Sequence, residues 1–434
     1  MKINDLPVEV LTRCFRLLYG SFTEHPHHVY DNLVAVSNVC REWQAVSISD
    51  AFSWAHVYID SGSDLAVVRD YVMLADDCAL RVHVELHRPS DAIYNIETTI
   101  TSDVGNLLTE LAAVLETLLP RTTLLRLESA SAVQTSFFIP QLHSISCPRL
   151  KTLEMNITSM ELDHSPALFH RVGDLDNLCL QNTLYARITN NVFANLTALM
   201  IVDIMDTPVL SDFTRILRAT PLLQFLRLED TDCDGDEDDK ATEISLQFLT
   251  HLQVGYAYGR SIALIARICA PSLLYLTLSH LTHSVLDIFV SNPPSWSAHV
   301  HYLAFPSFIS TGRMLRNILE LFPEIFFLDF SGMRQTWPMP DSRYPTFWFC
   351  INDVSSSAPG ICPQLRHMVL PAHDHEPLDS FLRSDVFGPS MRITYPVDRD
   401  SGAGIWMDAW CSGESMIRAL RTHDFPHFPT YAAI

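Results

Sequence analysis

Apolar residues recur along most of this chain with a fixed internal spacing. Each copy has an apolar residue, a second three positions later, and a third two positions beyond the second. The copies start 21 residues apart (175 to 196) to 27 residues apart (196 to 223), except for a last interval of 40 (325 to 365). The nine clear copies are Leu150/Leu153/Met155, Leu175/Leu178/Leu180, Leu196/Leu199/Ile201, Leu223/Leu226/Leu228, Leu249/Leu252/Val254, Leu273/Leu276/Leu278, Val300/Leu303/Phe305, Ile325/Leu328/Phe330 and Leu365/Met368/Leu370. Such a recurrence predicts a stack of similar structural units.

The spacing within each copy predicts a short strand that is followed by a helix. The last two apolar residues are two positions apart, so they point to one side of a strand. In five copies a proline lies two positions before the first apolar residue, where it stops a preceding helix from continuing. These prolines are Pro148, Pro221, Pro271, Pro323 and Pro363. Between copies the apolar spacing becomes helical, as it does at Leu315, Ile318, Leu319 and Phe322.

This strand signature resembles that of leucine-rich repeats. The resemblance implies an α/β solenoid, a horseshoe with parallel strands on its concave face and helices on its convex face. A single unit cannot bury its apolar face, but neighbours stacked in parallel can. A closed barrel of alternating strands and helices is the competing architecture, since it also has parallel strands and helical returns. The units look too numerous for that barrel.

We expect four regions along the chain. They are a helical module at 1–55, divergent first repeats at 56–118, leucine-rich repeats at 119–375, and a C-terminal repeat or cap at 376–434. In the divergent part, residues 57–59 and 80–86 alternate like strands, and residues 65–74 have helical spacing. The period breaks at about 331–362, a segment rich in Pro, Trp and Ser that we interpret as an insertion loop.

Three short helices are predicted in the N-terminal module. Pro7 stands where the first helix would begin, and Asp31 is a candidate cap for the second. The apolar positions of the three helices are Leu11, Cys14, Phe15 and Leu18, then Leu33, Val36 and Cys40, then Trp43 and Val46. Because so small a module has a marginal core, it is of the kind that a partner usually stabilises.

The N-terminal module resembles an F-box. The resemblance rests on Leu6-Pro7-x-Glu9, Phe15, Val39-Cys40-Arg41-x-Trp43 and Trp54. The downstream Pro-x-Leu-x-x-Leu-x-Leu copies extend it to F-box proteins with leucine-rich repeats, of the fungal type. One departure is that Gly20 to Tyr30 enlarges the usually tight junction between the first two helices.

The resemblance implies a substrate-recognition subunit of a Skp–cullin–F-box ubiquitin ligase. The F-box helices would bind a Skp-type adaptor, which links to a cullin–RING ligase, and the repeats would bind the target protein. Motif positions assign the adaptor contact to Leu6, Pro7, Leu11, Phe15, Leu33 and Val36. Trp43 and Trp54 would pack the module together. The open alternative is that all of these residues form the core of a helical cap on the solenoid.

A column of aromatic side chains is predicted on the concave face. The residue two positions after the start of each copy points away from the core by strand alternation. In six units these residues are Phe225, His251, Tyr275, Tyr302, Phe327 and His367. Rigid aromatic surfaces are enriched at binding hot spots, so the column is our candidate for target binding. Aromatic residues also suit strands and pack on one another, which leaves a purely structural role open.

Composition narrows the function classes. Net charge is −21, from 50 acidic and 29 basic residues, and such an acidic chain is a poor binder of nucleic acid or anionic membrane. Neither a secretory signal nor an apolar run long enough to span a membrane is present. The ten cysteines form no C-x-x-C pair, and Cys14 and Cys40 occupy apolar-pattern positions. We therefore expect buried thiols and a cytoplasmic or nuclear protein.

Chemical motifs offer little. Asp230-x-Asp232-x-Asp234-Gly235 opens like a calcium loop, but Ala241 stands where a bidentate Glu is required, so a solvated acidic loop is expected. Two histidine groups, His25/His27/His28 and His373/His375, match no zinc spacing. With no nucleotide-binding or hydrolase motif, we expect neither catalytic residue nor cofactor nor metal. The alternatives to the ligase adaptor are a repeat scaffold without a ligase role and an enzyme on a strand–helix barrel.

Overall fold

The computed structural model describes about three fifths of the chain, in segments. They are residues 6–20, 28–60, 62–86, 102–157, 169, 171–182, 193–204, 210–231, 243–255, 264–281, 287, 289–291, 293–308, 312–330, 364–369, 392–396, 406–410 and 416–420. The chain divides into two compact units, the first ending at Leu196 and the second beginning at Thr197. This division falls inside the predicted repeats, and the four predicted regions stay predictions.

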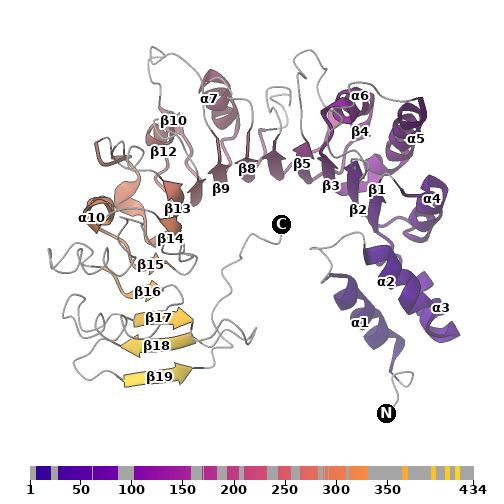
Figure 1. Cartoon of the computed structure of the whole chain (residues 1–434), viewed down its shortest axis with the longest axis horizontal. Coiled ribbons are helices and arrows are strands. Elements are labelled where there is room, and N and C mark those ends of the chain that lie inside the picture. Colours follow the sequence, from indigo (N-terminus) through magenta and orange to yellow (C-terminus); the bar gives the residue numbers. More distant parts are fainter. Residues whose placement is uncertain are drawn as a thin grey trace, which may run out of the picture. The chain divides into compact units, whose positions relative to one another are not determined.

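Three helices open the first unit (Figure 1). They are α1 (Val8–Gly20), α2 (His28–Ser37) and α3 (Arg41–Ser49). Helix α1 starts where Pro7 predicted, since the Pro7 carbonyl accepts hydrogen bonds from the amides of Val10 and Leu11. Three expectations were wrong. Helix α2 begins at His28, so Asp31 lies inside it and does not cap it. It ends at Ser37, so Cys40 lies beyond it and caps α3 instead. The Cys14 side chain is exposed. Cys14 borders the apolar face of its helix rather than lying at its centre.

Five parallel strands and three further helices make up most of the rest of the first unit. The strands, in sheet order, are β1 (His56–Asp60), β2 (Leu80–Leu86), β3 (Thr122–Ser129), β5 (Thr152–Ile157) and β7 (Asn177–Gln181). Helices on one side of the strands are α4 (Leu65–Leu74), α5 (Ser102–Leu118) and α6 (Ala132–Leu142) (Figure 1). Smaller elements are η3 (Leu119–Arg121) and the paired strands β4 (Ser146–Cys147) and β6 (Arg171–Val172).

The second unit continues the pattern. Its parallel strands, in sheet order, are β8 (Ala198–Val202), β9 (Phe225–Glu229), β11 (His251–Gly255), β13 (Tyr275–Leu281), β14 (Tyr302–Phe308), β15 (Phe327–Asp329), β16 (His367–Val369) and β17 (Arg392–Pro396). Two antiparallel strands follow, β18 (Trp406–Trp410) and β19 (Met416–Leu420). Other elements are α7 (Leu210–Ala219), α10 (Gly312–Glu320), η6 (Ser297–His299) and the paired strands β10 (Ile244–Ser245) and β12 (Ile268–Cys269).

The α/β arrangement with mostly parallel strands is therefore as predicted. The elements expected at 57–59, 65–74 and 80–86 are β1, α4 and β2. In each unit the described parallel strands follow one another in chain order, with the first unpaired to the last. This open order differs from that of a closed barrel.

The recurrent apolar residues form the core. Every triplet residue that the structure describes is at most 9% exposed, and most are at 0 or 1%. Only Leu370, the last residue of the last copy, lies outside the described part. The burial of these positions confirms the strand pattern, because only an alternating strand buries the second and third residues together.

The residues that directly follow three of the strands also share one backbone conformation. Strands β7, β8 and β9 are each followed at once by a residue with positive φ, namely Asn182, Asp203 and Asp230. Asn and Asp tolerate this left-handed conformation better than other side chains, because their short polar groups bond locally. The chain thus leaves three successive strands by the same turn, which is evidence for repetition beyond the core.

Candidate interaction surfaces

The six predicted aromatic residues do form one column on the second unit's open sheet face. They are Cα partners across successive strands from β9 to β16. Neighbouring ring centroids are separated by 6.3 Å (Phe225–His251), 4.2 Å (His251–Tyr275), 5.7 Å (Tyr275–Tyr302), 4.8 Å (Tyr302–Phe327) and 4.5 Å (Phe327–His367). All six side chains are half-buried. We call this set the aromatic column.

Polar contacts hold individual rings of the aromatic column in place. The Tyr302 hydroxyl donates to Asp329 Oδ2 at 2.6 Å, and the Thr250 hydroxyl lies 2.8 Å from His251 Nδ1. Burial lowers the pKa of His251 below its usual value, so this ring is neutral at pH 7. Burial, together with the Asp329 carboxylate, raises the pKa of Tyr302. The aromatic column is therefore uncharged over most of its length and ordered before any partner arrives.

The first unit carries a different set of side chains on its open sheet face. Its polar members come from four neighbouring strands. They are Tyr58 on β1, His83 and Glu85 on β2, Arg126 and Glu128 on β3, and Glu154 on β5. We call this set the charged cluster. The sequence pattern did not predict it, because the predicted column includes only the outward position before the second apolar residue. The outward positions on either side of the third apolar residue carry the charge.

Direct contacts link the members of the charged cluster. The Tyr58 hydroxyl donates to Glu85 Oε2 at 2.5 Å, and His83 Nε2 lies 3.2 Å from Glu128 Oε1. The Arg126 guanidinium donates to Glu128 and lies 3.8 Å from Glu154 Oε2. His83 and Arg126 lower the pKa of Glu128 to about 2, with part of the effect opposed by burial. Burial raises the pKa of Glu154.

The N-terminal helices bury most of the residues assigned to adaptor contact. Leu11, Phe15, Leu33 and Val36 are at most 8% exposed, whereas Leu6 is half-buried and Pro7 is exposed. Among the side chains that the structure describes on α1 to α3 and their flanks, the large apolar ones that reach the surface are Val8, Val10, Leu17, Val34, Val39, Ile48 and Phe52. A partner that docks on these helices meets that exposed set together with Leu6 and Pro7.

Internal contacts explain how this small module is held. Trp54 is 4% exposed and its indole donates to the Ser47 carbonyl at 2.8 Å, while the Trp43 ring lies 5.1 Å from Phe15. The Arg16 guanidinium donates to both carboxylate oxygens of Asp50, at 3.1 and 2.6 Å. Such a bidentate pair between α1 and the end of α3 fixes one helix against the other. Both tryptophans thus pack the module.

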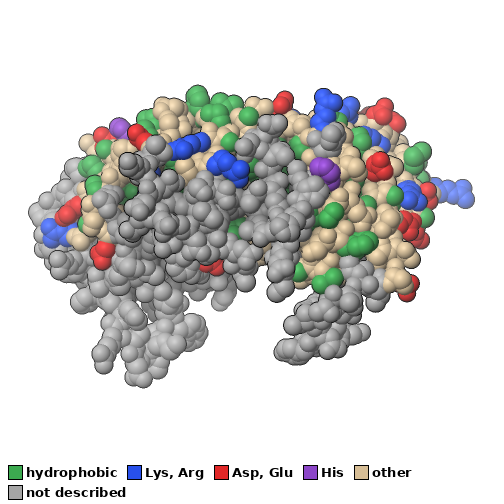
Figure 2. Space-filling model, turned by 90° about the horizontal axis from the view of Figure 1, so that it is seen from above, with side chains coloured by type: hydrophobic (Ala, Val, Ile, Leu, Met, Phe, Trp, Pro, Cys, Tyr) green, Lys and Arg blue, Asp and Glu red, His purple; other side chains and the backbone are tan. Residues whose placement is uncertain are grey.

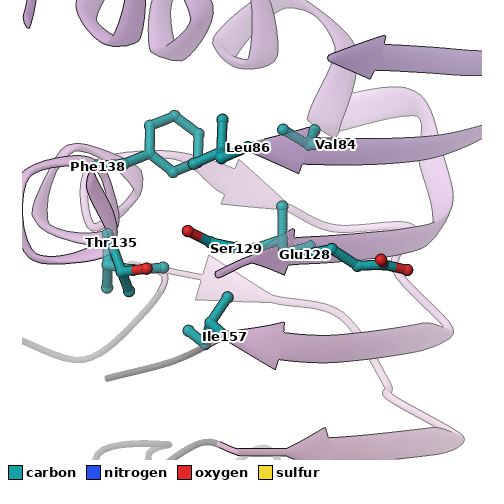
Figure 3. Close-up of a pocket in the computed structure, with 9 residues that line it drawn as sticks. Val84, Leu86, Glu128, Ser129, Thr135, Phe138 and Ile157 are labelled. Atoms are coloured by element: carbon teal, nitrogen blue, oxygen red, sulfur yellow. The ribbon is translucent and has the colours of Figure 1, made fainter. Parts of the chain in front are cut away.

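One pocket lies among β2, β3, β5 and α6 (Figure 3). It is lined by Val84, Leu86, Leu127, Glu128, Ser129, Thr135, Phe138, Ile139 and Ile157. The space has room for about one water molecule, so no organic substrate fits. Figure 3 shows the Glu128 carboxylate directed away from Phe138.

Charge is dispersed over the described surface that Figure 2 shows. Acidic and basic side chains alternate there with apolar ones. None of the described helices is long and apolar enough to cross a membrane. Of the two histidine groups, His25, His27, His373 and His375 lie outside the described residues, and His28 is the first residue of α2. The acidic run from residue 232 to residue 239 also lies outside them.

Comparisons with known proteins add little. No protein-family model and no curated protein matches the chain. A crystal structure of a protein from Bacteroides fragilis is similar at 10% identity, with a TM-score of 0.29 over 75% of this chain and 71% of that one. The crystal structure of a TLR13–ssRNA13 complex is similar at 13% identity, with a TM-score of 0.28 over 58% of this chain and 38% of that one. Likenesses this weak carry no argument about fold or function.

Proposed function

We propose that this protein is the substrate-recognition subunit of a Skp–cullin–F-box ubiquitin ligase, built as an F-box module followed by a leucine-rich-repeat horseshoe. In this proposal α1 to α3 bind a Skp-type adaptor, and the open sheet face binds the target protein. The protein contributes no bond-making residue, cofactor or metal to ubiquitin transfer. It would work in the cytoplasm or nucleus, where such ligases act.

The observation that carries the proposal is the aromatic column on an open face of stacked parallel strands. A ladder of ordered rings offers a large contact area at little entropic cost, because the side chains already hold one another. The strand-and-helix period and the Pro-x-Leu-x-x-Leu-x-Leu signature support leucine-rich repeats. The Leu6-Pro7 and Val39-Cys40-Arg41-x-Trp43 motifs, together with exposed apolar side chains on α1 to α3, support the F-box.

The mechanism would be proximity. A subunit that holds a target and a charged ubiquitin carrier in one complex raises the effective concentration of target lysines near the thioester. Such a subunit needs two independent binding surfaces, one for the adaptor and one for the target, and a rigid connection between them. It needs no pocket, which agrees with the small size of the one lined by Phe138.

Affinity capture of the tagged full-length chain from cells tests the adaptor role. The Skp-type adaptor should co-purify with the wild type and be lost from the Leu6→Ala/Pro7→Ala variant. Val67→Ala/Met73→Ala is a matched control, since both side chains are exposed apolar residues on α4. It should retain the adaptor. Absence of the adaptor from the wild-type complex would remove the ligase role.

A repeat scaffold without a ligase role is the second candidate. The burial of Leu11, Phe15, Leu33 and Val36 favours it, because four positions assigned to the adaptor serve as core residues of the module itself. On this alternative the Leu6→Ala/Pro7→Ala variant captures the same proteins as the wild type. An enzymatic function is the third and weakest candidate.

A further inference from the structure

Three side chains of the charged cluster converge from two neighbouring strands. His83, Glu85 and Glu128 each offer one ligand atom, and these atoms all lie within 4.8 Å of one another. The parallel register explains the convergence, because Glu85 and Glu128 are Cα partners and His83 is two positions before Glu85 on the same strand face. One imidazole nitrogen and two carboxylates around a common point are a donor set that a metal ion can use.

An orphaned nitrogen atom provides the second observation. The His83 side chain is 11% exposed, and its Nε2 atom is buried without a hydrogen-bond partner. Glu128 Oε1 lies 3.2 Å away, an ion-pair distance when His83 is protonated, and the presence of His83 lowers the pKa of Glu128. A buried ring nitrogen that lacks a partner is costly unless something binds it. A cation between His83 and the two carboxylates would satisfy it.

Neighbouring side chains already orient the three ligands. The Tyr58 hydroxyl holds Glu85, and the Tyr58 ring meets the His83 ring edge-on at 5.2 Å and 82°. Arg126 competes for Glu128, yet Glu154 lies within 3.8 Å and can take over that guanidinium. Such supporting contacts are typical of metal sites, where they fix ring orientation and ligand direction.

We propose that His83, Glu85 and Glu128 form a binding site for a divalent transition-metal ion of the zinc class. A nitrogen ligand with two carboxylates suits zinc and its neighbours, whereas calcium and magnesium prefer oxygen ligands alone. Three protein ligands leave a fourth position open in a tetrahedral site. Water or a side chain of a bound protein would complete it. The site does not depend on the ligase role.

Calorimetric titration of the purified full-length chain with Zn²⁺ at pH 7 tests the site, with Ca²⁺ and Mg²⁺ titrated in parallel. Other histidines also bind zinc, so the readout is the difference between variants. Glu128→Gln should remove one binding event from the wild-type isotherm. The control His301→Gln should keep it, because His301 pairs with Glu324 at 3.8 Å in the second unit and has no third ligand in the described structure.

A second variant separates metal binding from folding. Tyr58→Phe keeps the ring against His83 but loses the hydrogen bond to Glu85, and should weaken the same event by about tenfold. Thermal melting without metal shows whether each variant is folded. An isotherm that is identical in wild type, Glu128→Gln and Tyr58→Phe would overturn the proposal. So would equal affinity for Ca²⁺, because an acidic patch and not the imidazole would then be binding.

Discussion

The two units share one buried face and differ in what they expose. The row that forms the aromatic column in the second unit reads His56, Arg81, Leu124, Thr152 and Asn177 in the first. The first unit instead concentrates charge in the next two outward rows, as at His83, Arg126 and Glu128. Strand geometry is the same in both, so the outward residues alone create the difference. A repeat can therefore carry two chemically distinct surfaces on one backbone plan.

The shared buried face predicts the largest effects. Leu153→Ala on β5 and Leu226→Ala on β9 each remove most of a fully buried side chain. Each should lower the free energy of unfolding by about 2–5 kcal/mol, because the lost contacts and the new cavity both cost. Urea unfolding of the full-length chain measures this. If one variant cost under about 1 kcal/mol, the two units would not share an equivalent core.

The aromatic column predicts the next effect, on binding. Replacing Tyr275 and Tyr302 together by Ala should weaken capture of whichever protein the wild type retains by tenfold or more, as loss of a hot spot does. Asn177→Ala, in the same row of the first unit, should leave capture unchanged. Quantitative affinity capture measures both, and thermal melting shows that each variant is folded. Undiminished capture by the folded double variant would assign the column a structural role only.

The hydrogen bond from Tyr302 to Asp329 allows two roles of the aromatic column to be tested separately, the ordering of its rings and their contact with the target. Tyr302→Phe keeps the ring stacked on Phe327 but removes the bond to Asp329. We expect a loss of about 1–2 kcal/mol in unfolding free energy, because a half-buried carboxylate acceptor loses its donor. Target capture should stay near that of the wild type. A large drop in capture with unchanged stability would show that the hydroxyl itself contacts the target.

The charged cluster predicts the smallest effect, one that depends on pH. Because the pKa of Glu128 is lowered to about 2 in the folded chain, its ionised form stabilises the fold above pH about 4.5. That contribution is lost as the pH falls from about 4.5 to about 2. Urea unfolding should therefore find Glu128→Gln less stable than wild type at pH 7, by a margin that shrinks at pH 3. The margin is modest because Glu128 is partly solvated. If the difference in unfolding free energy between wild type and Glu128→Gln did not change with pH, it would contradict the ion pairing of Glu128 with His83 and Arg126.

Much of the fold was predictable because it depends on spacing. The buried triplets, the strands at 57–59 and 80–86 and the order of the aromatic column all follow from period-two alternation in a parallel stack. Helix caps were harder. Asp31 has a good capping side chain but lies inside α2, and Cys40 caps α3 although cysteine is an unusual cap. At these two positions the packing of the three helices decides where α2 and α3 begin, against the capping preference of the individual residues.

The sequence by itself determined which residues face inward, because hydrophobic spacing decides the side of a strand before any neighbour is known. Only the tertiary structure decided which outward residues meet. His83 and Glu128 are 45 residues apart (128 − 83) and contact one another through the register of β2 against β3. The length of the segment between the two strands sets that register, and no local pattern encodes it. For the same reason the charged cluster could not be predicted from the sequence. The aromatic column could be predicted, because it takes one residue from the same position of each regular repeat.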